Sequence, residues 1–259
     1  EEPTPLDGWL DARLRSRLSR LSSYMREYDV RSYSNEVYFE VPQDLRWYVK
    51  RGGRSRTAVR KAVETWVTLM APVTPHIAEE LWEAMGNERF VSTRQMPEGV
   101  VTDDVLREEA NEKLVEGLVA DVSEILKVTG VKPVKLVVMT APGWKRDMLR
   151  GALSQPKGKL DISSLIKSTM AKVKAPGAKK EVPAYAKELA STLGTSSEQD
   201  RKAMSLDIDE LSVLRGASPF LKEQFGCEVA VFPADDPDRE DPKGKAKFAR
   251  PGRPAVYVE

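Results

Sequence analysis

His76 and Cys227 are the only histidine and the only cysteine of the chain. Nucleophilic and acid–base catalysis commonly depend on histidine, cysteine or paired carboxylates in a suitable setting. His76 is expected in the first turn of a helix, where the positive end of the helix dipole disfavours the imidazolium, so we expect it to pack or bond locally. One residue of each kind can build neither a Cys/His zinc site nor an internal disulfide. We therefore predict no catalytic site and no metal site.

Phosphate-binding loops are also missing from the sequence, which contains neither Gly-x-x-x-x-Gly-Lys nor Gly-x-Gly-x-x-Gly. Cys227 lies in the apolar run from Phe225 to Phe232, which is typical of a strand. We expect Cys227 to act as a small buried hydrophobe.

The side chains best suited to bind a ligand lie between Asp44 and Glu64, in a segment with no acidic residue. Lysine and arginine contacts to phosphates release counterions and position a nucleic acid without reading its bases. Spacing places Tyr48 in a core and leaves Trp47 as the aromatic able to stack. The alternative is a solvated helix junction. The predicted RNA-binding residues of this basic segment are Arg46, Lys50, Arg51, Arg54, Arg56, Arg60 and Lys61.

Two further basic groups follow, and because the net charge is only +1, such local clusters must supply any nucleic-acid surface. The first is a loop around Pro176 and Gly177, from which Lys174 and Lys179 are predicted to bind RNA. The second runs from Lys243 to Arg253, and the acidic loop before it is expected to offset its charge.

The elements that would position these residues are helical in the first half of the chain. Apolar residues at steps of three and four predict a helix from Asp7 to Asp29, whose inner face is Leu10, Leu14, Leu18, Leu21, Met25 and Tyr28. Its arginines, Arg13, Arg15, Arg17, Arg20 and Arg26, would form either a solvated face or an RNA surface. Further helices are predicted over residues 31–51, with a kink at Pro42, and over 55–70, 75–85 and 103–127.

The pattern changes after Gly130 and Pro133. Residues 134–139 predict a strand, and helices are expected over 144–153, 162–173, 183–193 and 209–225. A strand around Val229 and a closing β segment over 255–259 follow. We therefore predict a multi-domain chain: an all-α helical bundle over residues 1–129, then a small α/β domain over 130–259.

The 259 residues, 41% hydrophobic and 31% charged, fit two soluble domains of ordinary size. No apolar run approaches the roughly 20 residues that cross a bilayer. The first residues also lack the basic and apolar regions of a secretory signal. We expect a cytoplasmic protein that does not contact membranes.

The run from Leu69 to Trp82 combines several structural signals. Pro72 ends one helix, Thr74 and Pro75 suit the start of the next, and Ile77, Leu81 and Trp82 would share an apolar face. This Pro-x-x-Pro-His-x-x-Glu-Glu-Leu-Trp pattern resembles the anticodon-binding bundle of the class I aminoacyl-tRNA synthetases for leucine, isoleucine, valine, methionine and cysteine.

Two other segments extend the resemblance. Residues 7–14, Asp-Gly-Trp-Leu-Asp-Ala-Arg-Leu, look like the Asp-Arg-Trp-Ile-Leu-Ser-Arg-Leu motif that follows the catalytic domain of these enzymes, with Gly8 and Asp11 as departures. Residues 44–48 and the closing Pro-Ala-Val-Tyr-Val-Glu of 254–259 resemble leucyl-tRNA synthetases of the archaeal and eukaryotic type. The chain is similar to the C-terminal part of such an enzyme.

The resemblance implies that the bundle lies along the anticodon arm of leucine tRNA and the small domain meets its long variable arm. Tyr257, Val258 and Glu259 would contact unpaired bases there, although composition favours a strand that closes a sheet. ATP and Mg²⁺ would belong to an absent catalytic domain, and no cofactor is expected in this fragment. The expected partners are leucine tRNA, the catalytic and editing domains of the parent chain, and other synthetases or assembly factors.

Two alternatives stand beside this interpretation. The chain could be the equivalent region of an isoleucyl or valyl enzyme, although neither a cysteine-bearing zinc segment nor a terminal coiled coil is visible. It could instead be a non-catalytic scaffold for protein partners.

Overall fold

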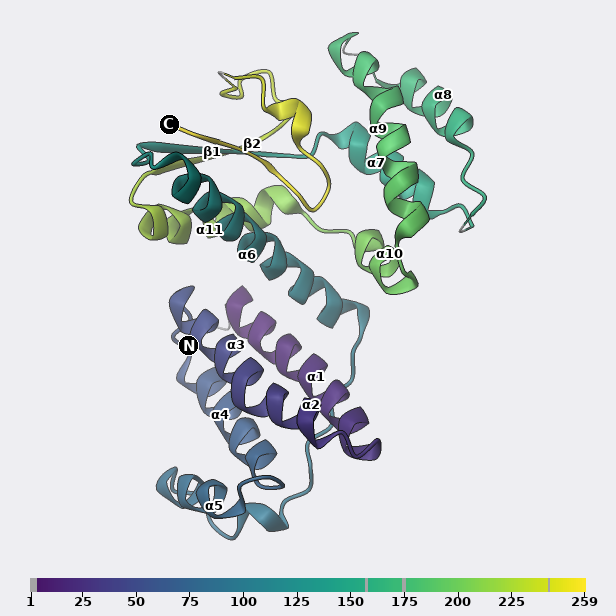
Figure 1. The fold of residues 1–259 in the computed structure, drawn as a ribbon. Coiled ribbons are helices and arrows are strands. Elements are labelled where there is room, and N and C mark those ends of the chain that lie inside the picture. Colours follow the sequence, from purple (N-terminus) through teal and green to yellow (C-terminus); the bar gives the residue numbers. More distant parts are fainter. Residues whose placement is uncertain (1–3, 157, 174–175, 242) are drawn as a thin grey trace. The chain divides into compact units, whose positions relative to one another are not determined.

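The computed structural model describes residues 4–156, 158–173, 176–241 and 243–259. The chain divides into two compact units, Glu1–Glu109 and Ala110–Glu259 (Figure 1). Helices build the first unit, and the second combines helices with one small sheet, which confirms the predicted fold class. Helix α6 (Asp103–Thr129) runs across the division between the units. The domain boundary at 129/130 stays a prediction.

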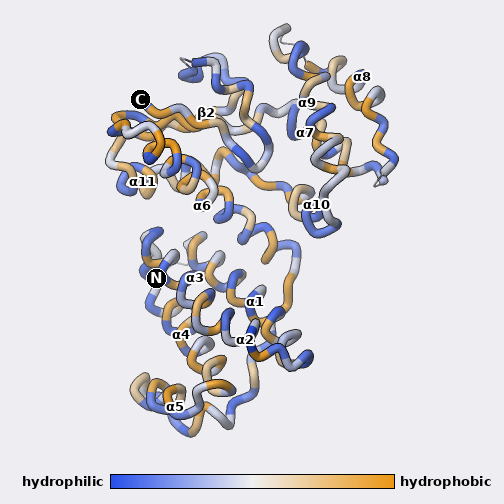
Figure 2. Tube along the Cα trace, in the orientation of Figure 1, coloured by the Kyte–Doolittle hydropathy of each residue, from blue (hydrophilic) through white to orange (hydrophobic). Residues whose placement is uncertain are grey.

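The first unit consists of helices that follow in order along the chain. Hydrophobic and hydrophilic positions alternate along them, as expected of helices with one buried face (Figure 2). Besides the start of α6, the elements are α1 (Pro5–Arg26), α2 (Val30–Asn35), a π-helical turn (Glu36–Glu40), α3 (Val41–Lys50), α4 (Arg56–Met70), α5 (Pro75–Ala84) and a 3₁₀ turn (Val91–Thr93).

Helix α1 begins with a capping box. The Thr4 hydroxyl accepts a hydrogen bond from the Asp7 amide, and the Asp7 carboxylate accepts one from the Thr4 amide. The predicted leucines at 10, 14, 18 and 21 are buried, but Met25 and Tyr28 are 45% and 89% exposed. The prediction was wrong at this end: Met25 lies in the exposed last turn of α1, and Tyr28 lies beyond the helix, which stops at Arg26, and takes a positive φ of 57°.

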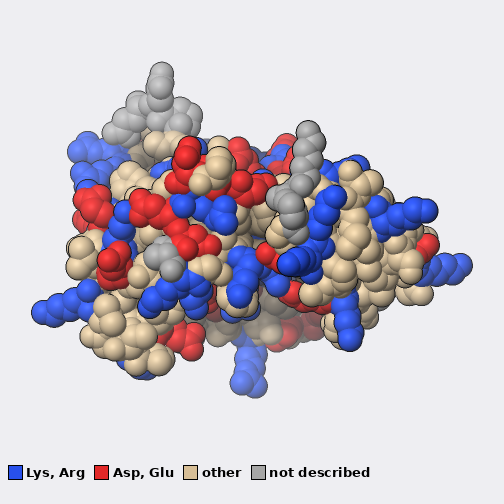
Figure 3. Space-filling view, turned by 90° about the horizontal axis from the view of Figure 1, so that it is seen from above, with Lys and Arg blue, Asp and Glu red and all other residues tan. Residues whose placement is uncertain are grey.

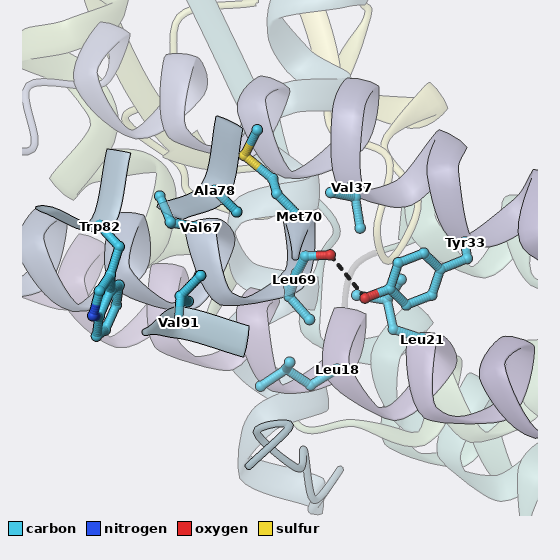
Figure 4. Close-up of a cluster of buried hydrophobic side chains, with 10 residues drawn as sticks. All are labelled: Leu18, Leu21, Tyr33, Val37, Val67, Leu69, Met70, Ala78, Trp82 and Val91. Atoms are coloured by element: carbon cyan, nitrogen blue, oxygen red, sulfur yellow. Dashed lines mark hydrogen bonds between the residues drawn. The ribbon is translucent and has the colours of Figure 1, made fainter. Parts of the chain in front are cut away.

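A hydrophobic core joins α1 to α2, α4, α5 and the π-helical turn (Figure 4). The buried ring of Tyr33 reaches across it, and its hydroxyl donates a hydrogen bond of 2.9 Å to the carbonyl of Leu69. A second cluster gathers Trp9, Leu14 and Tyr48. These clusters fix α3 and α4, the helices that carry the basic segment.

The kink predicted at Pro42 is a π-helical turn. Pro42 has no N–H, and its ring would clash with a carbonyl one turn earlier in a regular helix. The wider turn over Glu36–Glu40 lies directly before it, and Val41 N donates to the carbonyl of Glu36, five residues back. The helical path therefore continues into α3.

The break predicted at Pro72 is confirmed: α4 ends at Met70 and α5 starts at Pro75. Thr74 holds the N-cap position, but its hydroxyl bonds Tyr38 and the Met70 carbonyl instead of the helix. The predicted apolar face was wrong in part. Ala78 and Trp82 are buried, whereas Ile77 and Leu81 are 52% and 40% exposed.

From α6 onwards the chain alternates helices and strands. The elements are β1 (Lys135–Thr140), α7 (Gly143–Leu153), α8 (Ile162–Lys172), α9 (Pro176–Thr195), α10 (Glu198–Ser205), α11 (Glu210–Phe225), β2 (Glu228–Pro233), a 3₁₀ turn (Ala246–Phe248) and β3 (Ala255–Val258). Helix α9 begins earlier than predicted, with Pro183 inside it. Helix α10, which is short and opens with a capping box of Ser197 and Asp200, was not predicted.

The three strands form one sheet in the order β2-β1-β3. Strand β1 pairs with β2 in parallel and with β3 antiparallel. A parallel pair needs a long crossover, which α7 to α11 supply. As the central strand, β1 is buried from Leu136 to Thr140.

Two hydrophobic clusters stabilise the second unit. One lies among α7, α8 and α9, and the other lies between β1 and the segment that leads to β3. Cys227 is buried, as predicted, directly before β2, and burial raises the pKa of its thiol. In the described part of the chain, no helix is long and apolar enough to span a membrane.

Gly99 permits a close approach of two backbone segments. A Cβ added there would overlap the carbonyl of Arg15 in α1. We expect Gly99→Ala to lower the free energy of unfolding by about 1–3 kcal/mol, because backbone cannot yield as a side-chain tip can. Gly117, inside α6, has open space around its Cβ position, so Gly117→Ala should stabilise by about 0.5–1 kcal/mol. Urea denaturation of both variants measures the two changes in the free energy of unfolding. If both substitutions destabilise the protein, or both stabilise it, the expectation is contradicted.

Candidate nucleic-acid interface

The basic segment predicted from sequence occupies the end of α3, the Gly52–Gly53 turn and the start of α4. Gly52 takes a φ of 92°, and Ser55 caps α4 through the amide of Ala58. All of its predicted RNA-binding residues are exposed except Arg51, which is half-buried: Arg46, Lys50, Arg54, Arg56, Arg60 and Lys61. The structure therefore gathers these cations at one helix junction.

Two of these cations already have acidic partners. Arg60 pairs with Glu64 at 2.9 Å, and Lys61 pairs with Asp11 of α1 at 2.5 Å. Burial alone would raise the pKa of Asp11, but the Lys61 and Arg15 charges lower it. Arg54 and Arg56 are exposed and have no ion pair with any described residue, so both charges are open to a phosphate.

The two aromatic residues beside the segment differ in role. Tyr48 is fully buried and its hydroxyl donates to Asp7, which confirms it as core. Trp47 is half-buried against the cluster around Trp9, and the Lys50 ammonium lies 5.6 Å from its ring centroid. Trp47 is thus less open to stacking than predicted.

The arginines of α1 are mainly structural. Arg17 is 3% exposed and bonds Asp44 and Glu36, each at 2.7 Å. Arg13 also pairs with Asp44, and Arg20 with Glu36. Burial opposes the charge of Arg17, but these carboxylates raise its pKa above the ordinary value. Arg17 is buried, so neither predicted alternative holds for it, whereas the side chains of Arg13 and Arg20 stay 31% and 39% exposed.

The second basic group is only partly described. Lys174 lies outside the described residues. Lys179 is exposed near the start of α9, so it belongs to a helix and not to a loop as predicted.

The closing segment forms the edge strand β3. Glu259 exchanges backbone hydrogen bonds with Lys135, and Tyr257 faces Val137. Because antiparallel residues alternate between bonded and non-bonded pairs, the backbone groups of Val258 point away from β1. Of the three predicted base-contacting residues, Val258 therefore presents free backbone groups at the sheet edge. Contact of Tyr257, Val258 and Glu259 with bases stays a prediction.

The basic loop before β3 holds an exposed aromatic residue that the sequence analysis missed. Phe248 is 56% exposed, and the ammonium groups of Lys245 and Lys247 lie 5.9 and 5.1 Å from its ring centroid. The sequence feature that could have identified it is a phenylalanine inside a run of basic residues. Lysines, arginines and carboxylates are interspersed on the face of the molecule shown in Figure 3.

Comparison with known proteins is consistent with this arrangement. A family model described as the anticodon-binding domain of tRNA ligase matches residues 7–138. A leucine–tRNA ligase of Methanothrix thermoacetophila is 39% identical over all of this chain, which spans 26% of that protein. Those of Methanosarcina barkeri and Methanococcoides burtonii are each 35% identical over 98% of the chain and 26% of the relative.

The chain thus spans about a quarter of the length of the curated relatives it matches. The resemblance to class I synthetases found in residues 69–82 is confirmed, since the family model covers that segment and both units contain residues matched to leucine–tRNA ligases. The chain belongs to the anticodon-binding domain family of tRNA ligases.

Proposed function

We propose that this chain is the tRNA-binding C-terminal part of a leucine–tRNA ligase. The observation that carries the proposal is its similarity, over its whole length, to leucine–tRNA ligases. The first unit would contact the backbone along the anticodon arm of leucine tRNA, and residues 130–259 would contact the long variable arm. ATP, Mg²⁺ and the transfer of leucine would belong to a catalytic domain elsewhere in a cytoplasmic parent protein.

Electrostatics supports the role of the first unit. Arg54 and Arg56 are exposed and carry no ion pair with described residues, and they lie in the turn before α4 and at its first residue, next to helices fixed by buried aromatic side chains. Such cations bind phosphates without reading bases. Selection of leucine tRNA would then depend on the second unit, where β3 and the loop before it present backbone groups, lysines and an aromatic ring.

The test compares three RNAs at two salt concentrations: leucine tRNA, the same tRNA with a shortened variable arm, and a tRNA whose arm is naturally short. We expect the intact long arm to bind best and all three affinities to fall with salt. Equal, salt-sensitive binding would limit the function to a general backbone surface. Binding to none would favour the protein scaffold.

Deletion of residues 254–259 is a poor test of arm recognition. It removes the whole of β3 and leaves one edge of the central strand unpaired. A loss of binding would then report the loss of structure. Substitution of single exposed side chains separates the two effects.

A further inference from the structure

Phe248 is an exposed large apolar residue between buried small ones. The 3₁₀ turn that carries it, Ala246–Phe248, directs small residues inward: Ala246 and Ala249 are 5% and 0% exposed. The large apolar ring is 56% exposed. Hydrophobic burial alone would favour the opposite arrangement, so the local fold holds the ring in solvent.

The loop around Phe248 is held in place from several sides. The Asp241 carboxylate accepts hydrogen bonds from the amides of Lys245 and Ala246, at 2.5 and 3.1 Å. On the other side, Arg250 forms a bidentate ion pair with Glu188 of α9, at 2.8 and 2.7 Å. The two parallel hydrogen bonds of such a pair fix the orientation of the arginine side chain in addition to pairing its charge.

Lys145 of α7 supports the same loop from inside the second unit. Its side chain is 1% exposed, and its ammonium donates to the carbonyls of Lys247 and Ala249 at 2.7 and 3.0 Å. These two residues flank Phe248. Burial and the nearby Arg250 charge lower the pKa of Lys145 to about 8, although Glu181 opposes the shift. A buried lysine is costly, and here it holds the backbone on both sides of an exposed ring.

The charge around the ring suits a nucleic acid. The ammonium groups of Lys245 and Lys247 lie within 5.9 Å of the Phe248 ring centroid, and both side chains are exposed. An aromatic ring among flexible cations is the combination that binds an unpaired base, because the ring stacks on the base and the cations meet its phosphates.

We propose that Phe248 is a preorganised stacking platform for one unpaired nucleobase of the bound tRNA. Lys245 and Lys247 contact the phosphates that flank this base, and Lys145 is a positioning residue that acts through the loop. The inference rests on the proposed function and adds to it a residue and a mode of contact.

The test uses the full 259-residue chain and leucine tRNA with 2-aminopurine placed in turn at the unpaired positions of its variable arm. We expect Phe248→Ala to weaken binding about 5- to 150-fold, the range of one lost base stack. Phe248→Trp should retain affinity. The slope of log affinity against log salt should stay unchanged in Phe248→Ala, whereas Lys247→Ala should make it shallower. At one position the 2-aminopurine fluorescence should differ between the wild-type and Phe248→Ala complexes.

The role of Lys145 is tested with Lys145→Met and the double variant. If Lys145 acts through Phe248, the double variant should bind no more weakly than the weaker single variant, because coupled residues are not additive. Additive losses would overturn this positioning role.

The outcomes separate the two proposals. Salt-sensitive binding by the wild type, with Phe248→Ala within twofold of it, overturns the stacking platform and leaves the proposed function in place. No binding by the wild type overturns the proposed function and the inference with it.

Discussion

Replacement of Arg17 by leucine is expected to lower the free energy of unfolding of the first unit by about 3–5 kcal/mol. The substitution leaves Asp44 and Glu36, which are 5% and 8% exposed, without their main partner. Desolvated carboxylates that lose a partner are strongly destabilising. Chemical denaturation followed by circular dichroism measures the change.

The matched control is Arg15→Leu. Arg15 lies on the same helix and pairs with Asp11, but its side chain is 49% exposed. An exposed pair contributes about 0–1 kcal/mol, so this variant should stay close to the wild type. Equal effects of the two substitutions would show that the buried network gives no particular stability.

Lowering the pH should reduce the stability that the ion pairs of Arg17 and Glu36 provide. Burial would raise the pKa of Glu36, but hydrogen bonds and charges from Arg20 and Arg17 lower it below the ordinary 4.5. The unfolded chain then binds this proton more readily than the folded chain. The contribution of Glu36 is complete above about pH 4.5 and is lost as the pH falls through the folded pKa. Arg17→Leu should make this acid sensitivity smaller, as denaturation at several pH values would show.

Neutralisation of Arg54 and Arg56 together, by glutamine, is expected to weaken binding to all tRNAs by about tenfold or more. It should also make the slope of log affinity against log salt shallower by roughly 0.7–0.9 for each lost phosphate contact. Both charges are exposed and have no ion pair with described residues. Affinity measured at several salt concentrations, with leucine tRNA and a short-armed tRNA, tests both expectations.

The control removes the same number of charges from the same segment. Arg60 and Lys61 already pair with Glu64 and Asp11, so their replacement by glutamine should change the salt slope less. If the two double variants lose affinity equally, net charge and not the open arginines would account for binding. A selective loss for leucine tRNA would also contradict a backbone contact.

Much of the helix layout could be predicted from the sequence. Pro72 and the Gly52–Gly53 turn end helices for local reasons: proline lacks an N–H, and Gly52 adopts a positive φ. The spacing of leucines identified the inner face of α1. The run from Leu69 to Trp82 identified the family, because several fixed residue types recur there at fixed distances.

Burial of charged residues was harder to predict. Arg17 lies three residues after Leu14 and four before Leu21, which places it on the apolar face of the helix. This spacing indicated that its side chain would be buried. Of its partners, Glu36 lies in the π-helical turn and Asp44 in α3, both after the turn that ends α1. Periodicity within one helix says nothing about which carboxylates another helix will bring to it.

By itself, the sequence determined where the helices break, the helical and α/β halves of the fold, the family and the basic segment, since these depend on local backbone chemistry and residue spacing. Only the tertiary structure decided which cations are open. Arg54 and Arg56 remain exposed, whereas Arg17 and Lys145 are buried by contacts with residues distant in sequence. A charge becomes available to a ligand only when folding leaves it without a partner, and that depends on how separate elements pack together.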